Sequence, residues 1–216
     1  MRSLNRLNEP EILIHKKNEW LQKLKENGKT RPDSSKYRNP NILLQLNTIS
    51  NSKCYYCESL LKQVPSEVDH HIEVKCDLDK SYEWDNLFLA CDNCNNKVPH
   101  NVIPIESTLN PFIDSDDEIK RHITFDDEII RIKDHSVKGD QTIKKYRLST
   151  DLLDHKRIKQ LNIFYKVIEE IRKKQIEQNG REMNEDEKEI IRSFKSIDKP
   201  YSLMFTVLFE KNNTLI

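Results

Sequence analysis

Two C-x-x-C pairs constrain this chain more than any other feature of its sequence. Cys54 and Cys57 form the first pair, Cys91 and Cys94 form the second, and residues 58–90 lie between them. A turn over two residues lets both sulfurs of a pair face one point, so two such turns supply the tetrahedral ligand set that zinc prefers. Because four thiolates leave no open position for water, the expected zinc site is structural.

Disulfide bonds and a thioredoxin-like redox pair are the competing interpretations of these cysteines. The N-terminal residues carry charges with no apolar segment after them, so no secretory signal is predicted and a reducing cytoplasmic location is expected. No βαβ pattern surrounds either pair, which argues against the redox motif. The fifth cysteine, Cys76, is expected to be a free thiol that is buried or half-buried.

Charge and glycine content exclude several classes of protein. The 216 residues include 36 basic and 36 acidic side chains, and this zero net charge argues against a uniformly basic DNA-binding protein. The 3 glycines are too far apart to form the phosphate loop of a P-loop ATPase or a Rossmann dehydrogenase. No apolar run approaches the roughly 20 residues that a transmembrane helix needs, so a soluble protein with no membrane partner is expected.

The charges are segregated along the chain. Residues 41–111, which hold the cysteine pairs, are acidic, whereas residues 1–40 and 135–181 are basic. The strongest basic run, 172–174, either contacts a nucleic-acid backbone or forms the solvated face of an exposed helix.

Proline and glycine positions predict the elements of the first half of the chain. Pro10 is expected to open a helix that extends to about Asn27, and Pro40 is expected to begin a short helix. Residues 62–75 are expected to form two short strands, and residues 92–98 a short helix.

The second half of the chain is predicted to be mainly helical. A hairpin is expected at 121–134, followed by a long helix from about Asp151 to Gly180. Asn184 is expected to cap a further helix, and the apolar run 201–209 fits either a helix or a strand.

The segment between the cysteine pairs carries the residues that a one-metal phosphodiesterase needs. Asp69 and His70 are adjacent in EVDHHIEVK, Asn86 follows, and Asn95 comes directly after the second cysteine pair. A divalent ion near the scissile phosphate would neutralise developing charge and stabilise the leaving oxygen. A histidine would take a proton from the attacking water, provided that a partner orients its neutral ring.

The ordered pattern C-x-x-C, VDH, N, C-x-x-C-N-x-K resembles the HNH, or ββα-metal, endonucleases with a four-cysteine zinc site. The resemblance implies that His70 is the general base and that Asn86 positions its loop. It also implies that Asp69 and Asn95 hold the catalytic divalent ion, Mg²⁺ or a similar cation. The family name has His where this chain has Asn95, which puts the metal affinity in question, and His71 is a second candidate for the base.

The resemblance extends beyond the cysteine pairs. The stretches LNRLNEPEIL near the N-terminus, YEWDNLFLACDNCNNK in the middle and QTIKKYRLST at 141–150 are similar to the nuclease subunit of Septu-type and retron-associated anti-phage systems. That resemblance implies a nuclease effector that works with a partner ATPase of the ABC or SMC-like class.

The expected fold class is α+β, with a ββα-metal module at residues 50–112 that a four-cysteine zinc site pins together. A helical region at 1–49 precedes this module, and a mainly helical region at 113–216 follows it. The expected function is metal-dependent endonucleolytic hydrolysis of nucleic acid, with DNA favoured over RNA. The competing hypothesis is a non-catalytic zinc adaptor that links nucleic acid to a partner ATPase.

Two further residues carry expectations from the sequence. Lys97 either contacts a phosphate as a point charge or is a solvated lysine near a helix end. Trp84 is expected in the core, in preference to a role in stacking on bases.

Overall fold

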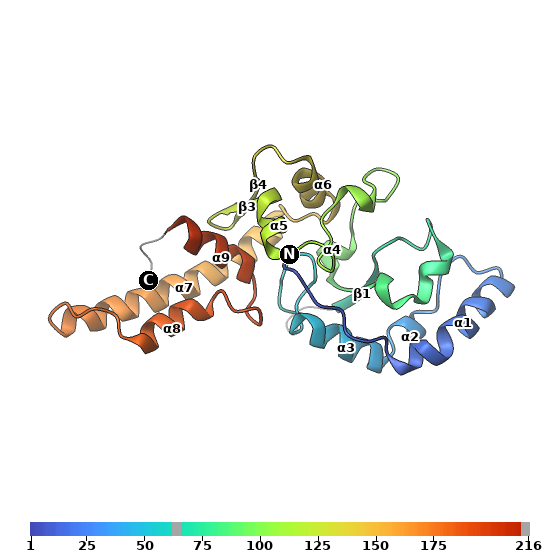
Figure 1. The fold of residues 1–216 in the computed structure, drawn as a ribbon, viewed down its shortest axis with the longest axis horizontal. Coiled ribbons are helices and arrows are strands. Elements are labelled where there is room, and N and C mark those ends of the chain that lie inside the picture. The colour runs from blue at the N-terminus through green and yellow to red at the C-terminus, as the bar shows by residue number, and fades with distance from the viewer. Residues whose placement is uncertain (62–65, 213–216) are drawn as a thin grey trace.

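Helices surround two small antiparallel sheets in this α+β protein (Figure 1). The computed structural model describes residues 1–61 and 66–212. The helices of the first half are α1 (Glu11–Glu26), α2 (Ser34–Tyr37), α3 (Pro40–Ser50) and α4 (Asp92–Asn95). Those of the second half are α5 (Asp116–His122), α6 (Val137–Lys145), α7 (Asp151–Glu177), α8 (Glu185–Ser193) and α9 (Ser202–Lys211). The strands are β1 (Ser66–His70), β2 (Leu87–Cys91), β3 (Ile123–Asp126) and β4 (Ile129–Ile132), and short 3₁₀ turns occupy Leu78–Tyr82, Trp84–Asn86 and Ile105–Ser107.

The predicted N-terminal helices are confirmed. Pro10 immediately precedes α1, and Pro40 occupies the first turn of α3, where its missing N–H costs no hydrogen bond. The side chain of Asn39 caps α3 by accepting a hydrogen bond from the backbone N–H of Asn41. Ile42 and Leu46 on the inner face of α3 are fully buried, so this helix packs against the central sheet.

The central sheet pairs β1 with β2, and this pairing corrects the sequence prediction. Two strands within 62–75 are not found: residues 66–70 form β1, residues 71–77 turn away, and 62–65 lie outside the described residues. The partner strand β2, with the sequence LFLAC, is buried at every position. A strand covered on both faces has no alternation of apolar and polar residues, so periodicity alone cannot distinguish this apolar run from a buried helix.

The second sheet is a hairpin, as predicted, but a helix precedes it. Residues 116–122 form α5, so Arg121 and His122 belong to a helix and not to the expected strand. Ser115 caps α5 through its hydroxyl, and three acidic residues follow in the first turn. The short helix α6, which the sequence prediction missed, is likewise capped by Ser136.

The three C-terminal helices extend away from the central sheet as an arm (Figure 1). The long α7 carries α8 along its side, and Asn184 caps α8 through a reciprocal hydrogen-bond pair with Glu187. The apolar run 201–209 forms a helix, α9, which resolves the choice left open by the sequence. Phe164 lies among Phe194, Phe205 and Phe209, at ring-centroid distances of 5.1 to 5.6 Å.

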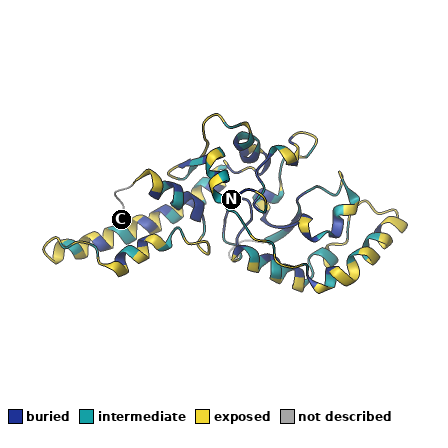
Figure 2. Cartoon of the chain, viewed as in Figure 1, coloured by how far each residue is buried: buried dark blue, intermediate teal, exposed yellow. Residues whose placement is uncertain are grey.

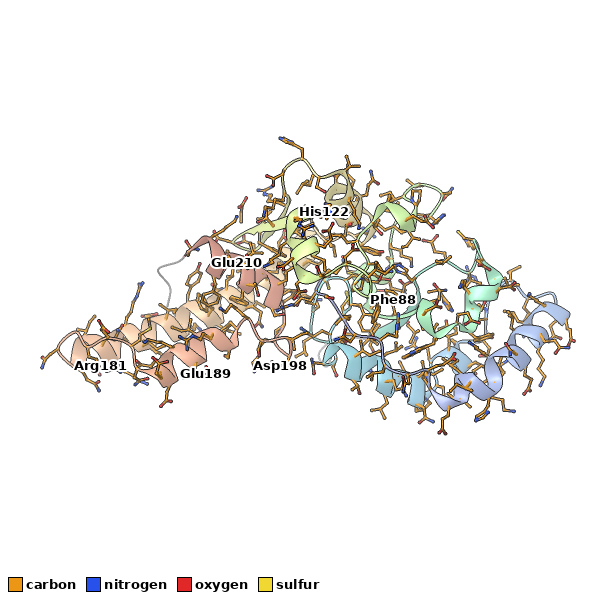
Figure 3. The ribbon with its side chains drawn as sticks, viewed as in Figure 1. Phe88, His122, Arg181, Glu189, Asp198 and Glu210 are labelled. Carbon is orange, nitrogen blue, oxygen red and sulfur yellow. The ribbon has the colours of Figure 1, made fainter. Side chains whose placement is uncertain are left out.

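Buried residues concentrate where the central sheet meets the helices, and exposed ones at the ends of the elongated molecule (Figure 2). Phe88, on β2, lies in the body of the molecule, whereas Arg181 and Glu189 lie on the arm (Figure 3). Trp84 is 6% exposed and its ring N–H donates to the carbonyl oxygen of Leu7, so its predicted place in the core is confirmed. The domain boundaries at 49/50 and 112/113 remain predictions.

Candidate active site

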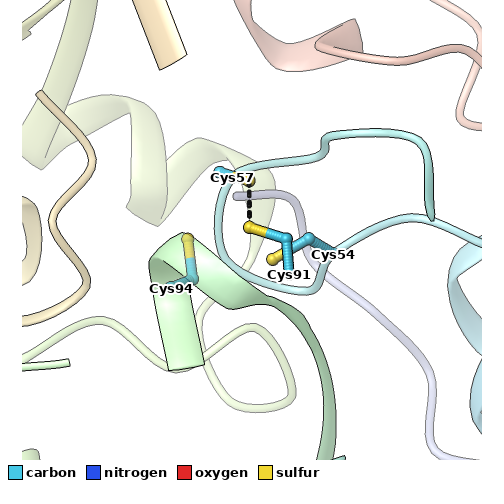
Figure 4. Close-up of side chains that lie close together, drawn as sticks. All are labelled: Cys54, Cys57, Cys91 and Cys94. Carbon is cyan, nitrogen blue, oxygen red and sulfur yellow. Dashed lines mark hydrogen bonds between the residues drawn. The ribbon is translucent and has the colours of Figure 1, made fainter. Parts of the chain in front are cut away.

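The side chains of the two cysteine pairs lie close together in one cluster (Figure 4). Cys54 and Cys57 lie on a turn that precedes β1, Cys91 ends β2, and Cys94 lies one turn into α4. The four Sγ atoms lie within 4.8 Å of one another, and those of Cys57 and Cys91 are 3.6 Å apart. Tetrahedral zinc with Zn–S bonds of about 2.3 Å separates its sulfurs by about 3.8 Å, so the cluster is compatible with structural zinc.

Burial of the cluster supplies a second argument for a cation. All four cysteines are buried and are free thiols in the structure. Desolvation raises the pKa of Cys54 and Cys94 well above the ordinary value of a thiol, whereas the pKa of Cys57 is lowered, because hydrogen bonds from the other three thiols outweigh its desolvation. A buried cluster of four thiolates carries a large negative charge, which a bound metal ion would compensate.

The fold brings three of the four predicted catalytic residues to one cleft. Asp69 and His70 end β1, and Asn95 ends α4, which packs beside β1 because it follows β2 directly. The cleft has a volume of about 410 Å³. It is lined by Thr30, Arg31, Pro32, Tyr37, Val68, Asp69, His70, Glu73, Val74, Lys75, Asn95, Lys97 and Pro99.

The imidazole of His70 is held in one orientation. Its Nε2 lies 2.9 Å from the carbonyl oxygen of Ser81. Since a carbonyl only accepts hydrogen bonds, the neutral ring carries its proton on Nε2 and leaves Nδ1 as the basic nitrogen. The ring of Tyr37 meets that of His70 edge-on at a centroid distance of 4.8 Å. Burial lowers the pKa of His70 below its ordinary value, which favours this neutral form.

Asp69 is buried and closely paired. Lys97 Nζ donates to both of its carboxylate oxygens at 2.8 Å, and Tyr56 Oη donates to Oδ2 at 2.6 Å. The same ammonium donates to the carbonyl oxygens of His70 at 2.6 Å and His71 at 3.0 Å. Of the two alternatives for Lys97, a solvated lysine near a helix end is wrong, because only 4% of its side chain is exposed.

Asn86 lies outside the cleft and ties down the turn that follows β1. Its Oδ1 accepts from the backbone N–H of Ile72 at 2.6 Å, and its Nδ2 donates to the carbonyl oxygens of Ile72 and Lys80, each at 3.0 Å. Its own backbone carbonyl accepts from the N–H of His71 at 2.9 Å. Through these bonds Asn86 connects residues 71–72, which follow His70, to Lys80, which precedes Ser81.

His71 points away from the cleft that His70 lines. Its ring stacks on Phe88 at a centroid distance of 4.1 Å and an interplanar angle of 5°. Its Nδ1 lies 3.3 Å from Tyr56 Oη, and its Nε2 lies 3.3 Å from Asn110 Nδ2. Burial lowers the pKa of His71 well below the ordinary value. This placement favours His70 over His71 as the base.

Several residues of the site carried no signal that sequence reasoning could use. Ser81, Tyr37 and Arg31 come from segments with no motif, and their proximity to His70 depends on the tertiary fold. Tyr56 lies inside the first C-x-x-C pair, where a conspicuous aromatic residue was the available clue. Cys76 is exposed, which corrects the expectation of a buried or half-buried thiol.

A comparison with known families identifies the class of this site. Residues 54–100 match the family described as HNH endonuclease, and this range contains all four predicted catalytic residues and all four clustered cysteines. The chain therefore carries an HNH endonuclease domain.

Two curated relatives share a more specific similarity. The chain is 28% identical over 152 residues to the Septu protein PtuB of Bacillus mycoides (strain KBAB4), covering 57% of this chain and 52% of the relative. It is 30% identical over 148 residues to the Septu protein PtuB of Bacillus thuringiensis, covering 68% of this chain and 54% of the relative. The chain thus spans about half the length of the curated relatives that it matches.

Among the described residues, none of the helices has the length and apolar character that crossing a bilayer requires. The longest, α7, has charged residues along its whole length.

Proposed function

We propose that this protein is a metal-dependent endonuclease that hydrolyses phosphodiester bonds of nucleic acid at the cleft between β1 and α4. One observation carries the proposal. Asp69, His70 and Asn95 line a single cleft, and His70 presents Nδ1 as its basic nitrogen because Ser81 accepts the hydrogen bond from Nε2. A base, an anionic ligand and a neutral oxygen donor on one surface are the parts that water attack on a phosphodiester requires.

His70 would act as the general base. Its Nδ1 would take a proton from the attacking water while the Nε2–H bond to the carbonyl of Ser81 keeps the ring in the productive tautomer. Asp69 is adjacent in the chain, and its negative charge favours the imidazolium that forms, whereas the ammonium of Lys97 paired with it opposes that charge. Tyr37 packs against the edge of the ring and limits its rotation.

Asp69 and Asn95 would hold the divalent ion. Oxygen donors suit Mg²⁺, which is usually bound by one or two protein ligands and several waters. The Asn95 side chain makes no hydrogen bond within residues 1–61 and 66–212. Asp69 Oδ1 accepts one bond from Lys97 and keeps a second lone pair. Both residues therefore have an oxygen available to bind a divalent ion. When bound, the ion would neutralise charge on the phosphate and stabilise the leaving oxygen.

The proposed biological setting is an anti-phage defence complex in which this chain is the nuclease and a separate ATPase is its partner. The similarity to two Septu proteins named PtuB supports this setting. DNA is the favoured substrate and RNA the alternative, since the proposed chemistry neither needs nor forbids a 2′-hydroxyl.

The deciding experiment is cleavage of labelled DNA and RNA by wild type and His70→Ala, each alone and with the ATPase encoded beside it. We expect cleavage that needs Mg²⁺ and is lost in His70→Ala, while zinc content and circular dichroism stay unchanged. His155→Ala is the matched control, because His155 is exposed on α7 and does not line the cleft. Cleavage by His70→Ala at the wild-type rate would refute the assignment of the base.

The second candidate is a non-catalytic zinc adaptor. The ammonium of Lys97 already compensates the charge of Asp69, so this carboxylate needs no divalent ion for its charge balance, which favours the adaptor. The two candidates differ in their need for a second metal. A chelator that removes Mg²⁺ and spares bound zinc should stop an enzyme and leave nucleic-acid binding by an adaptor unchanged.

A further inference from the structure

Both acidic residues that line the catalytic cleft are already paired with lysines of the protein itself. Asp69 is bound by Lys97, and Glu73 Oε1 accepts from Lys145 Nζ at 3.0 Å. The side chain of Lys145 is completely buried. Because each carboxylate has its own cation, neither contributes an uncompensated negative charge to the cleft.

Two exposed cations that line the same cleft have no such partner. Arg31 lies in the connection between α1 and α2, and Lys75 lies in the turn after β1. Neither side chain makes a hydrogen bond or ion pair with any residue of the described ranges. The cleft therefore carries an uncompensated positive charge, although the segment 41–111 that forms most of it is acidic in sequence and the chain is neutral overall.

We propose that Arg31 and Lys75 bind the phosphodiester backbone of the substrate and hold it against His70. The proposal rests on the proposed function, since it places the substrate at the same cleft. Arg31 offers a planar fork of donors that matches two phosphate oxygens, and Lys75 offers a point charge. Arg31 lies outside the 54–100 range that matches the HNH family, so the N-terminal region contributes to substrate binding.

This arrangement explains how a chain of zero net charge can bind a polyanion. Affinity for a nucleic-acid backbone depends on the cations that touch phosphates, and each neutralised phosphate releases counterions. A net charge of zero therefore does not prevent binding, provided that these local cations contact the phosphates. The basic run on α7 at 172–174 is the competing location for backbone binding, and the experiment compares the two places directly.

The test measures binding separately from cleavage. His70→Ala protein, which the proposed mechanism leaves unable to cleave, is titrated into fluorescein-labelled single- and double-stranded DNA and RNA at several salt concentrations. Fluorescence anisotropy gives the Kd at each salt concentration. The Arg31→Ala/Lys75→Ala variant on this background removes two exposed cations from the cleft. The matched control, Arg172→Ala/Lys174→Ala, removes one exposed arginine and one exposed lysine from α7.

We expect the cleft variant to bind at least about tenfold more weakly at low salt. Its slope of log affinity against log salt should fall by roughly 0.7–0.9 for each phosphate that is no longer neutralised, and the control should leave both values unchanged. Equal weakening in the two variants, weakening in the α7 variant alone, or absence of binding to all four probes would overturn the proposal. Binding that behaves as expected while wild type never cleaves would instead refute the proposed enzyme and leave backbone binding by Arg31 and Lys75 standing.

Discussion

The ammonium of Lys97 lies 2.8 Å from each carboxylate oxygen of Asp69, and both side chains are almost fully buried. Two backbone carbonyls and this carboxylate form a cage of oxygens around the Lys97 nitrogen. A cage of this composition also suits a divalent cation. Lys97 therefore acts as a tethered cation that restricts Asp69 to a single outer lone pair for metal binding.

Replacing Lys97 by Met should make the stability of the protein depend on Mg²⁺. Removing one partner of a buried ion pair leaves an uncompensated charge, and we expect a loss of about 3–5 kcal/mol in the free energy of unfolding. A divalent ion that occupies the oxygen cage would restore part of this loss by mass action. The measurement is the Tm of Lys97→Met and of wild type with increasing Mg²⁺.

Lys97→Arg is the control, because it keeps the positive charge beside Asp69 and should show little dependence on Mg²⁺. A Tm of Lys97→Met that is the same in EDTA and in Mg²⁺ would contradict the prediction.

Loss of one clustered cysteine should release the metal and unfold the module. Cys57→Ser removes a ligand from the four-sulfur site. Structural zinc contributes about 10–16 kcal/mol in small zinc-binding peptides, comparable to the whole stability of a domain. We expect loss of bound zinc by elemental analysis and a broad, early thermal transition. Cys76→Ser provides the comparison, since Cys76 is exposed and outside the cluster, and it should retain one zinc per chain with an unchanged Tm.

Asn86→Asp should loosen the turn that follows β1. The carboxylate would face the carbonyl oxygens of Ile72 and Lys80, which now accept hydrogen bonds from the Asn86 amide. Leaving buried polar groups without partners costs about 1–3 kcal/mol each, so we expect a loss of about 2–4 kcal/mol in urea unfolding. Amide hydrogen exchange should accelerate in residues 71–81.

Asn96→Asp is the matched substitution, because Asn96 is exposed and, among residues 1–61 and 66–212, its side chain bonds only to Asp92 in its own helical turn. If Asn86→Asp were as stable and as protected from exchange as Asn96→Asp, the bridging role of Asn86 would be excluded.

Tyr37 should matter for turnover through its ring and not through its hydroxyl. The ring meets His70 edge-on, so removing it would let the imidazole rotate away from the orientation set by Ser81. On the proposed mechanism, Tyr37→Ala should lower kcat by about 10- to 100-fold with little change in KM. Tyr37→Phe keeps the ring and should retain wild-type kcat. Equal kcat in Tyr37→Ala and wild type would contradict this role and show that the hydrogen bond to Ser81 alone is enough to orient the His70 ring.

Local signals in the sequence predicted much of the helical structure. Pro10, Pro40 and Asn184 mark helix starts that the structure confirms, because a proline or a capping side chain acts within a few residues of its own position. The partner of β1 was misplaced because β2 is buried on both faces and lacks alternation. Helix α6 escaped notice because it has few apolar residues at helical spacing.

In the candidate site, the sequence motif predicted which residues lie together at the cleft. The residues that bind and orient them could be identified only from the fold. Asp69, His70 and Asn95 were recognised from their order relative to the cysteine pairs, and all three line the cleft. The pairing of Lys97 with Asp69 could not be predicted, since Lys97 follows Asp69 by 28 positions in the sequence and only the packing of α4 beside β1 brings them together.

Asn95 follows Cys94 directly in the single turn of α4, so one short helix serves both the sulfur cluster and the cleft. If zinc holds the four sulfurs together, loss of the metal would, on the proposed function, be expected to displace Asn95 from the cleft and to leave the chain inactive. The fraction of the protein that is active in a cell would then depend on the zinc available to it, and zinc starvation would leave the nuclease inactive.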